Sequence, residues 1–159
     1  MKQYTPLELT KKLVSFDTTS RESNLNLIAF AASYLETLGV SSRLIHNADS
    51  TKANLYATIG PADVPGVVLS GHTDVVPVDG QDWTTPPFEP VESGGQLFGR
   101  GTSDMKSFIA TALALAPDMV AANLKMPIHF AFSYDEEVGC LGVHGIVDHL
   151  TGITPLPRA

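Results

Sequence analysis

Apolar residues recur at helical spacing in four segments of the chain. The first two segments open on a capping-box signal, Thr5 with Glu8 and Thr19 with Glu22, in which side chains satisfy free backbone N–H groups. Gly39 ends the second segment, as glycine commonly does at helix ends. We therefore expect helices over 5–15, between 19 and 39, from 103 to 116 and over 142–150.

Short extended segments lie between these predicted helices. Strands are expected at 42–45, 54–59, 67–69, 96–98 and 128–134. The compact apolar segment Val67–Leu69 is expected to be buried on both faces, and the proline-rich stretch 77–95 to form an irregular surface loop. Interleaved helices and strands predict an α/β fold, here a three-layer α/β/α sandwich with a mixed, mostly parallel sheet.

Composition favours a single folded domain. The chain has 159 residues, of which 43% are hydrophobic and 17% charged, enough apolar material for a core and too little charge for disorder. The net charge is −7 and no basic cluster occurs, so nucleic acid is not an expected partner. The single cysteine, Cys140, fits a reducing compartment and is expected to be packed and not nucleophilic.

Targeting signals are not evident in the sequence. The N-terminal residues contain no apolar leader, and no run approaches the roughly 20 apolar residues that a membrane helix needs. We therefore expect a cytoplasmic protein without a membrane partner.

Ionisable residues follow both strong strands. Val67–Leu69 leads to His72 and Asp74, and 128–134 leads to Glu136 and Glu137. Open α/β sheets bind ligands beyond the carboxyl ends of their strands, so both clusters lie where a site is expected.

His72 has two interpretations. A lone histidine in a turn often does no more than form a hydrogen bond. With Gly71 before it and Asp74 two residues later, His72 can instead be a metal ligand whose second ring nitrogen is held by a carboxylate. Local spacing leaves both interpretations open.

Asp104 and the Glu136–Glu137 pair are the other candidates. Asp104, Ser103 or Thr102 could simply cap a helix, but the preceding Gly-Arg-Gly loop is more than a cap requires. Adjacent acids at a strand end usually lie at the surface, whereas a buried strand exit favours them only if a cation is present. One glutamate could then bind a metal while the other accepts a proton from water, which is the chemistry of metal-assisted hydrolysis.

Three segments together resemble the M20-type metallopeptidases, the family that contains acetylornithine deacetylase, succinyl-diaminopimelate desuccinylase, aminoacylase and glutamate carboxypeptidases. The segments are 70–77 (Ser-Gly-His-Thr-Asp-Val-Val-Pro), 99–106 (Gly-Arg-Gly-Thr-Ser-Asp-Met-Lys) and 135–139 (Asp-Glu-Glu-Val-Gly). His72 and Asp104 are as far apart in sequence as Asp104 and Glu136, and the resemblance extends over essentially the whole chain.

The resemblance implies a role for each candidate residue. His72 would bind one Zn²⁺, Asp104 would bridge two metals about 3.5–4 Å apart, and Glu137 would bind the other. Glu136 would be the general base and Asp74 would orient His72. Cobalt is a possible substitute for zinc, and the substrate would be a small N-acyl amino acid.

Within the family, the amino-acid sequences of all three motifs are most similar to those of the acetylornithine deacetylases. This implies hydrolysis of N2-acetylornithine to ornithine and acetate in arginine biosynthesis. A desuccinylase, aminoacylase or carboxypeptidase activity is the alternative, because these relatives share the motifs.

Length is the main departure from the family. Members are more than twice as long, form homodimers through an inserted domain, and carry further metal ligands that are absent here. Residues 1–159 are therefore expected to be one N-terminal, metal-binding catalytic subdomain, incomplete and inactive alone. A non-enzymatic metal-binding or interaction domain is the second hypothesis. A dinuclear phosphoesterase is the third, although the further His and Asn motifs of such sites are missing.

Overall fold

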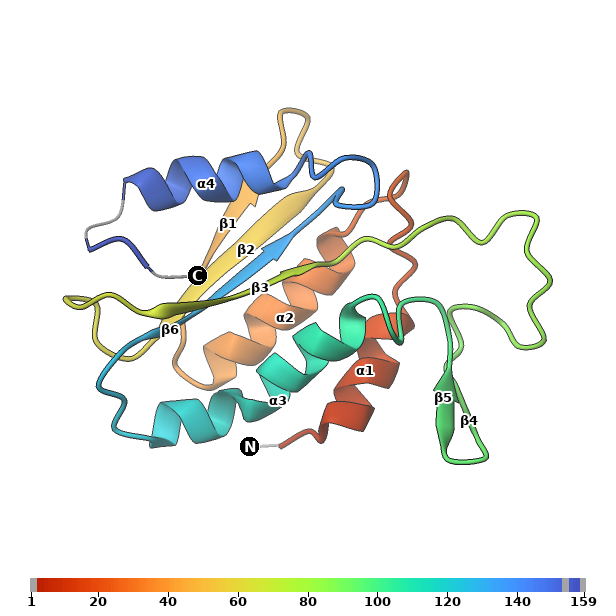
Figure 1. Cartoon of the computed structure of the whole chain (residues 1–159), viewed down its shortest axis with the longest axis horizontal. Helices are drawn as coiled ribbons and strands as arrows, with labels where there is room; N and C mark the ends of the chain where they lie inside the picture. Colours follow the sequence, from red (N-terminus) through yellow and green to blue (C-terminus); the bar gives the residue numbers. More distant parts are fainter. Residues whose placement is uncertain (1–2, 153–154, 158–159) are drawn as a thin grey trace.

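The computed structural model describes residues 3–152 and 155–157, and within them helices and strands interleave as the hydrophobic pattern predicts (Figure 1). The helices are α1 (Pro6–Val14), α2 (Leu25–Thr37), α3 (Lys106–Ala121) and α4 (Val143–Thr151). The strands are β1 (Ser42–His46), β2 (Ala53–Ile59), β3 (Val67–His72), β4 (Val91–Ser93), β5 (Gln96–Phe98) and β6 (Ile128–Ser133).

The central sheet has four strands in the order β1-β2-β6-β3, and β4 pairs with β5 in a separate hairpin. β3 runs parallel to β6, whereas β1–β2 and β2–β6 are antiparallel. The predicted mixed sheet is confirmed, but the prediction that most of its pairs are parallel is wrong for these strands. The short turn from Asn47 to Lys52 allows only a hairpin, because a parallel connection needs a crossover of a dozen or more residues.

Helices cover both faces of the sheet, which confirms the three-layer α/β/α arrangement. α4 lies on one face, and α1, α2 and α3 lie on the other (Figure 1). Alternation along the strands divides their side chains between two cores: Leu55, Phe130 and Phe132 join the large core under α2 and α3, whereas Tyr56 and Ala131 pack under α4. Full burial of each large apolar side chain contributes about 1.5–3 kcal/mol.

The two capping-box predictions have different outcomes. Thr5 and Glu8 form the expected box at the start of α1. The segment 19–22 forms a turn instead, and α2 begins only at Leu25. Thr19 forms a parallel bridge with Val75, so tertiary pairing overrides the local helix signal.

β3 differs from its prediction in burial. Val67 is 42% exposed, because β3 is the last strand at its side of the sheet that the described residues form. The prediction that Val67–Leu69 is buried on both faces is therefore wrong for these residues. Within residues 3–152 and 155–157, no helix is long and apolar enough to cross a membrane.

Candidate metal centre

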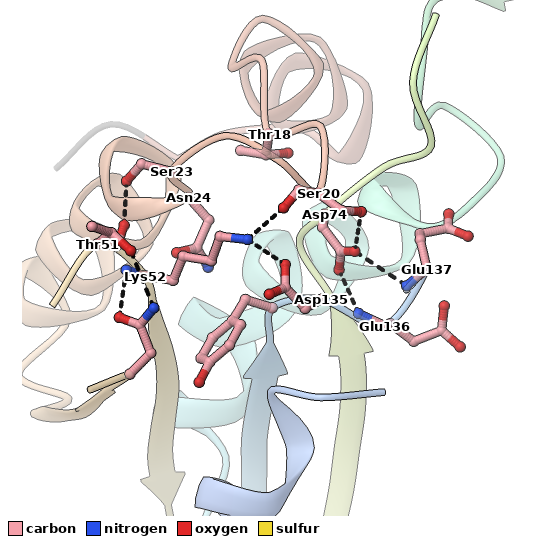
Figure 2. A network of polar contacts seen from close by, with 12 residues as sticks. Thr18, Ser20, Ser23, Asn24, Thr51, Lys52, Asp74, Asp135, Glu136 and Glu137 are labelled. Carbon is pink, nitrogen blue, oxygen red and sulfur yellow. Dashed lines mark hydrogen bonds and ion pairs between the residues drawn. The ribbon is translucent and has the colours of Figure 1, made fainter. Parts of the chain in front are cut away.

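The parallel pairing of β3 and β6 brings two predicted clusters to the same edge of the sheet. His72 is paired with Ser133 in the strand register, and Thr73 donates a backbone hydrogen bond of 2.8 Å to the Ser133 carbonyl. The segments that follow β3 and β6 leave the sheet together. Asp74 and the acidic turn Asp135–Glu137 therefore lie side by side beyond the strand ends (Figure 2).

His72 is almost fully buried and is held through both ring nitrogens. Its Nδ1 lies 2.9 Å from the backbone carbonyl of Asp74 and 3.6 Å from the carboxylate of that residue. Its Nε2 lies 3.0 Å from Asp104 Oδ1 and 3.7 Å from Glu136 Oε2. Burial opposes protonation of the ring, but the contacts with Asp74 and Asp104 prevail and raise the pKa of His72 to about 9. Nδ1 is thus held in place while Nε2 faces the acids.

Asp74 supports the acidic turn as well as the histidine. Its carboxylate accepts hydrogen bonds from the backbone N–H groups of Glu136 and Glu137, at 3.0 and 3.2 Å, and from the Ser20 hydroxyl at 2.7 Å (Figure 2). Burial alone would raise the pKa of this carboxyl, but the hydrogen bonds from His72, Ser20 and the two amides hold it below its usual value. Asp74 therefore stays ionised and fixes the turn by its backbone.

Asp104 reaches the site from the loop before α3. Its side chain is 73% exposed, and no side-chain cap forms at the start of α3. The capping interpretation of Asp104 is therefore wrong. Gly101 has φ +88°, and a Cβ there would lie 2.9 Å from Val75, which explains the glycine-rich approach to this position.

The arrangement fits a divalent metal. His72, Glu136 and Glu137 can each place one ligand atom within 4.8 Å of the others. Two ligands on one tetrahedral zinc lie roughly 3.3–3.5 Å apart, and the distances from His72 Nε2 to Asp104 and Glu136 bracket that value. Burial is the largest cause that raises the pKa of Glu137, and repulsion from the Asp104 carboxylate is the next. A bound cation would reduce the repulsion between these carboxylates.

A pocket of about 280 Å³ opens beside the site and includes His72, Met105, Glu136 and Cys140 in its wall. A larger open hollow of about 640 Å³ lies at the opposite end of the sheet, near Gly60, away from these side chains. The smaller pocket, unlike this hollow, offers space next to the candidate ligands.

Cys140 departs from its prediction in part. The thiol is exposed and not packed, and it donates a weak contact of 3.7 Å to Glu136 Oε1. Partial desolvation and the neighbouring Glu136 carboxylate raise the pKa of Cys140, which agrees with the expectation that it is not a nucleophile.

Two polar residues at the site were not singled out from the sequence. Lys52, at the end of the turn before β2, forms an ion pair of 2.5 Å with Asp135 and also donates to the Ser20 carbonyl (Figure 2). Ser20 in turn donates to Asp74. No local pattern indicated these residues, because Lys52 and Asp135 are 83 positions apart in the sequence.

Residues 68–157 match the model of a known protein family, described as peptidase family M20/M25/M40. The chain is also similar to curated acetylornithine deacetylases. It is 37% identical to the protein of Proteus mirabilis over 140 residues, and 33% identical to that of Pasteurella multocida over 150 residues. These alignments cover 87% and 94% of the chain but only 36% and 39% of the relatives, so the chain spans less than two fifths of their length.

Solved structures show the same fold. Human carnosine dipeptidase 1 superposes with a TM-score of 0.75 at 25% identity, over 91% of this chain and 34% of that one. An M20 family metallo-carboxypeptidase from Sulfolobus solfataricus superposes with a TM-score of 0.80 at 21% identity, over 93% of this chain and 35% of that one.

Proposed function

The chain belongs to peptidase family M20/M25/M40, and from this we propose that residues 1–159 are the N-terminal metal-binding subdomain of a zinc-dependent amide hydrolase. The observation that carries the proposal is the convergence of the ligand atoms of His72, Glu136 and Glu137 beyond two parallel strands. The contact between Asp104 and His72 adds a fourth candidate ligand from a separate loop.

We assign His72, Asp104 and Glu137 as the residues that would hold the metal, and the resemblance to the family implies that Asp104 would be shared between two zinc ions. His72 suits this role because Asp74 engages Nδ1 and leaves Nε2 directed at the acids. Bound zinc or cobalt would supply Lewis acidity and lower the pKa of water. The contacts with Asp74 and Asp104 raise the pKa of His72 to about 9, so metal binding must displace a proton from the ring and should weaken as the pH falls.

Glu136 is assigned as the general base. Its carboxylate lies 3.7 Å from His72 Nε2 and in the wall of the 280 Å³ pocket, so it can accept a proton from water and deliver it to a leaving amine. Both Glu136 and Glu137 belong to the group of possible ligands. The division between base and ligand therefore follows the resemblance to the family.

The proposed substrate is a small N-acyl amino acid, with N2-acetylornithine first. Identity of 33–37% to acetylornithine deacetylases supports this choice. A succinylated or peptide substrate is the alternative within the same family. The chain spans less than two fifths of those relatives, so we expect turnover to require the remaining length and the 159-residue chain alone to bind metal without catalysis.

Cobalt titration of the 159-residue chain tests the metal site. We expect a saturable visible absorption band that zinc displaces, and an affinity at least about tenfold lower in His72→Ala and Asp104→Ala. His144→Ala is the matched control, because His144 is exposed on α4 and should leave the titration unchanged. Equal affinity in all four proteins would contradict the assigned ligands.

Turnover tests the assignment of the base. In a chain extended by the C-terminal length that the relatives carry, Glu136→Gln should reduce kcat for N2-acetylornithine by about 10²–10⁴-fold while cobalt binding persists. Retained turnover would exclude Glu136 as the base. Zinc-dependent hydrolysis by the 159-residue chain alone would refute the non-enzymatic alternative.

A further inference from the structure

We infer that Lys52 is a positioning residue for the acidic turn Asp135–Glu137, and that it acts through its ion pair with Asp135 and its contact with the Ser20 carbonyl. The inference rests on the proposed function, since it assigns a purpose to the turn that presents Glu136 and Glu137. Lys52 lies outside the three motifs and touches no candidate metal ligand in the contacts described above.

The contacts form a closed circuit around the base of the site. Lys52 Nζ binds the Asp135 carboxylate at 2.5 Å and the Ser20 carbonyl. The Ser20 hydroxyl binds Asp74 Oδ2 at 2.7 Å, and Asp74 accepts the backbone N–H groups of the two residues that follow Asp135 (Figure 2). Lys52 therefore holds one end of the turn through Asp135, and Asp74 holds the other end through the two backbone N–H groups. Ser20 contacts both Lys52 and Asp74 and so connects these two sets of contacts.

The backbone of Asp135 gives the ion pair a specific conformation to hold. Its φ is +54°, in the left-handed region that few residues with a side chain adopt, although Asp does so more readily than most. This conformation sets the direction in which Glu136 and Glu137 leave β6. The ion pair with Lys52 fixes the Asp135 side chain and so favours this direction of Glu136 and Glu137 over the other conformations that a surface turn can adopt.

The environment of the pair makes it more than an ordinary surface contact. The side chains of Lys52 and Asp135 are only 13% and 15% exposed, so solvent screens their attraction less than in an exposed pair. The Lys11–Glu92 pair joins α1 to β4 and involves no site residue, with side chains that are 38% and 50% exposed. Lys11 therefore offers a matched control.

Lys52→Met tests the inference by two readouts on the 159-residue chain. The first is cobalt affinity, expected to fall about tenfold, the lower end of the range for removing a direct partner of a metal ligand, because Lys52 acts on the ligands only through the turn. The second, which requires no metal, is the hydrogen-exchange protection of the Glu136 and Glu137 amides, expected to drop at least about tenfold. Lys52→Arg should restore much of both, and Lys11→Met should change neither.

The outcomes separate the two proposals. Unchanged amide protection and cobalt affinity in a folded Lys52→Met chain would overturn the positioning role and leave the metal site intact. Lost protection in a chain whose wild type binds no cobalt would overturn the proposed function and support the positioning role. Asp135→Asn should reproduce Lys52→Met, and combining the two should add little further loss, because both remove the same contact. If the losses of amide protection and cobalt affinity in the two variants added up in the double variant, Lys52 and Asp135 would not act through their shared ion pair.

Discussion

At the scale of single residues, the site combines one buried imidazole with several carboxylates. His72 has a pKa raised to about 9, against 6.5 for a free histidine, although burial opposes its charge. Its protonated form therefore stabilises the metal-free fold below pH 6.5, and this contribution is lost as the pH rises through about 9. Buried Lys106 acts in the opposite direction, because desolvation lowers its pKa from 10.5 to about 7. Its buried charge destabilises the fold below pH 7, and this destabilisation is lost as the pH rises from about 7 to 10.5.

We predict that the stabilising effect of His72 in the metal-free chain is about 3 kcal/mol smaller at pH 9 and above than at pH 6. The measurement is the difference in unfolding free energy between wild type and His72→Asn, by urea titration with a chelator present. Taking the difference removes the opposing contribution of Lys106, which both proteins share. A difference that does not vary with pH would show that His72 is not protonated in the metal-free fold.

Asp74 is expected to matter more to stability than its place beside a ligand suggests. Asp74→Ala leaves the N–H groups of Glu136 and Glu137 without their acceptor, and we predict a loss of about 2–4 kcal/mol in unfolding free energy. Because its pKa is lowered from 3.8, this contribution is present above pH 3.8 and is lost as the pH falls through the folded value.

Urea unfolding at pH 7 and pH 3 checks the prediction for Asp74. The exposed Asp79, paired with Arg21 at the surface, is the matched control, and its alanine variant should unfold like the wild type. Similar losses for both variants would show that the hydrogen bonds to the turn contribute no special stability.

The sequence reveals the site residues by type but not the way they are held. His72, Asp104 and the glutamate pair could be found from their positions after strands and a glycine-rich loop. The orienting contact of Asp74 runs partly through its backbone carbonyl, and its carboxylate binds the amides of a turn 62 and 63 positions away. Such contacts depend on which strands are neighbours, which local spacing does not encode.

At the scale of elements, the start of α4 is tied to the end of β6. The Asn54 side chain donates to the Gly142 carbonyl at 2.7 Å and accepts from the Tyr134 N–H at 3.2 Å, so it links both elements to β2. A Cβ on Gly142 would lie 2.1 Å from the Tyr134 carbonyl oxygen. This distance is far below van der Waals contact, so a larger residue must displace α4.

We therefore predict that Gly142→Ala lowers the unfolding free energy by about 2–3 kcal/mol, although the backbone conformation of Gly142 suits any residue. Gly152→Ala, at the other end of α4, meets its nearest atom at 3.5 Å and should stay within about 0.5 kcal/mol of wild type. Thermal or urea unfolding measures both. Equal stability of the two variants would mean that α4 adjusts without cost.

Helix and strand periodicity predicted most of these elements, and the errors have physical causes. The helix signal at 19–22 failed because Thr19 pairs with Val75, and Asn24 uses its side chain on Ala53 and Thr73 instead of capping α2. The burial of Val67–Leu69 was overestimated because apolar character fits a central strand and an edge strand alike. Neighbours in the sheet, not the segment itself, decide that difference.

At the scale of the whole molecule, the net charge is −7, and several of the acids are gathered at one edge of the sheet. Burial and the surrounding carboxylates raise the pKa of Glu137, which reflects the free energy cost of this gathering in the metal-free chain. A divalent cation that binds only the folded state removes this repulsion and adds its own binding free energy to folding. Metal binding and global stability should therefore be coupled.

We predict that zinc at about 100 times its dissociation constant stabilises the chain by about 2.7 kcal/mol, which raises Tm by about 5–10 °C. Calorimetry with and without zinc measures the shift, and a chelator should reverse it. Glu137→Gln should lose most of the shift. Asp63→Asn changes the net charge equally at an exposed position and should retain it. If both variants respond to zinc as wild type does, the stabilisation arises from general charge neutralisation and not from a site that contains Glu137.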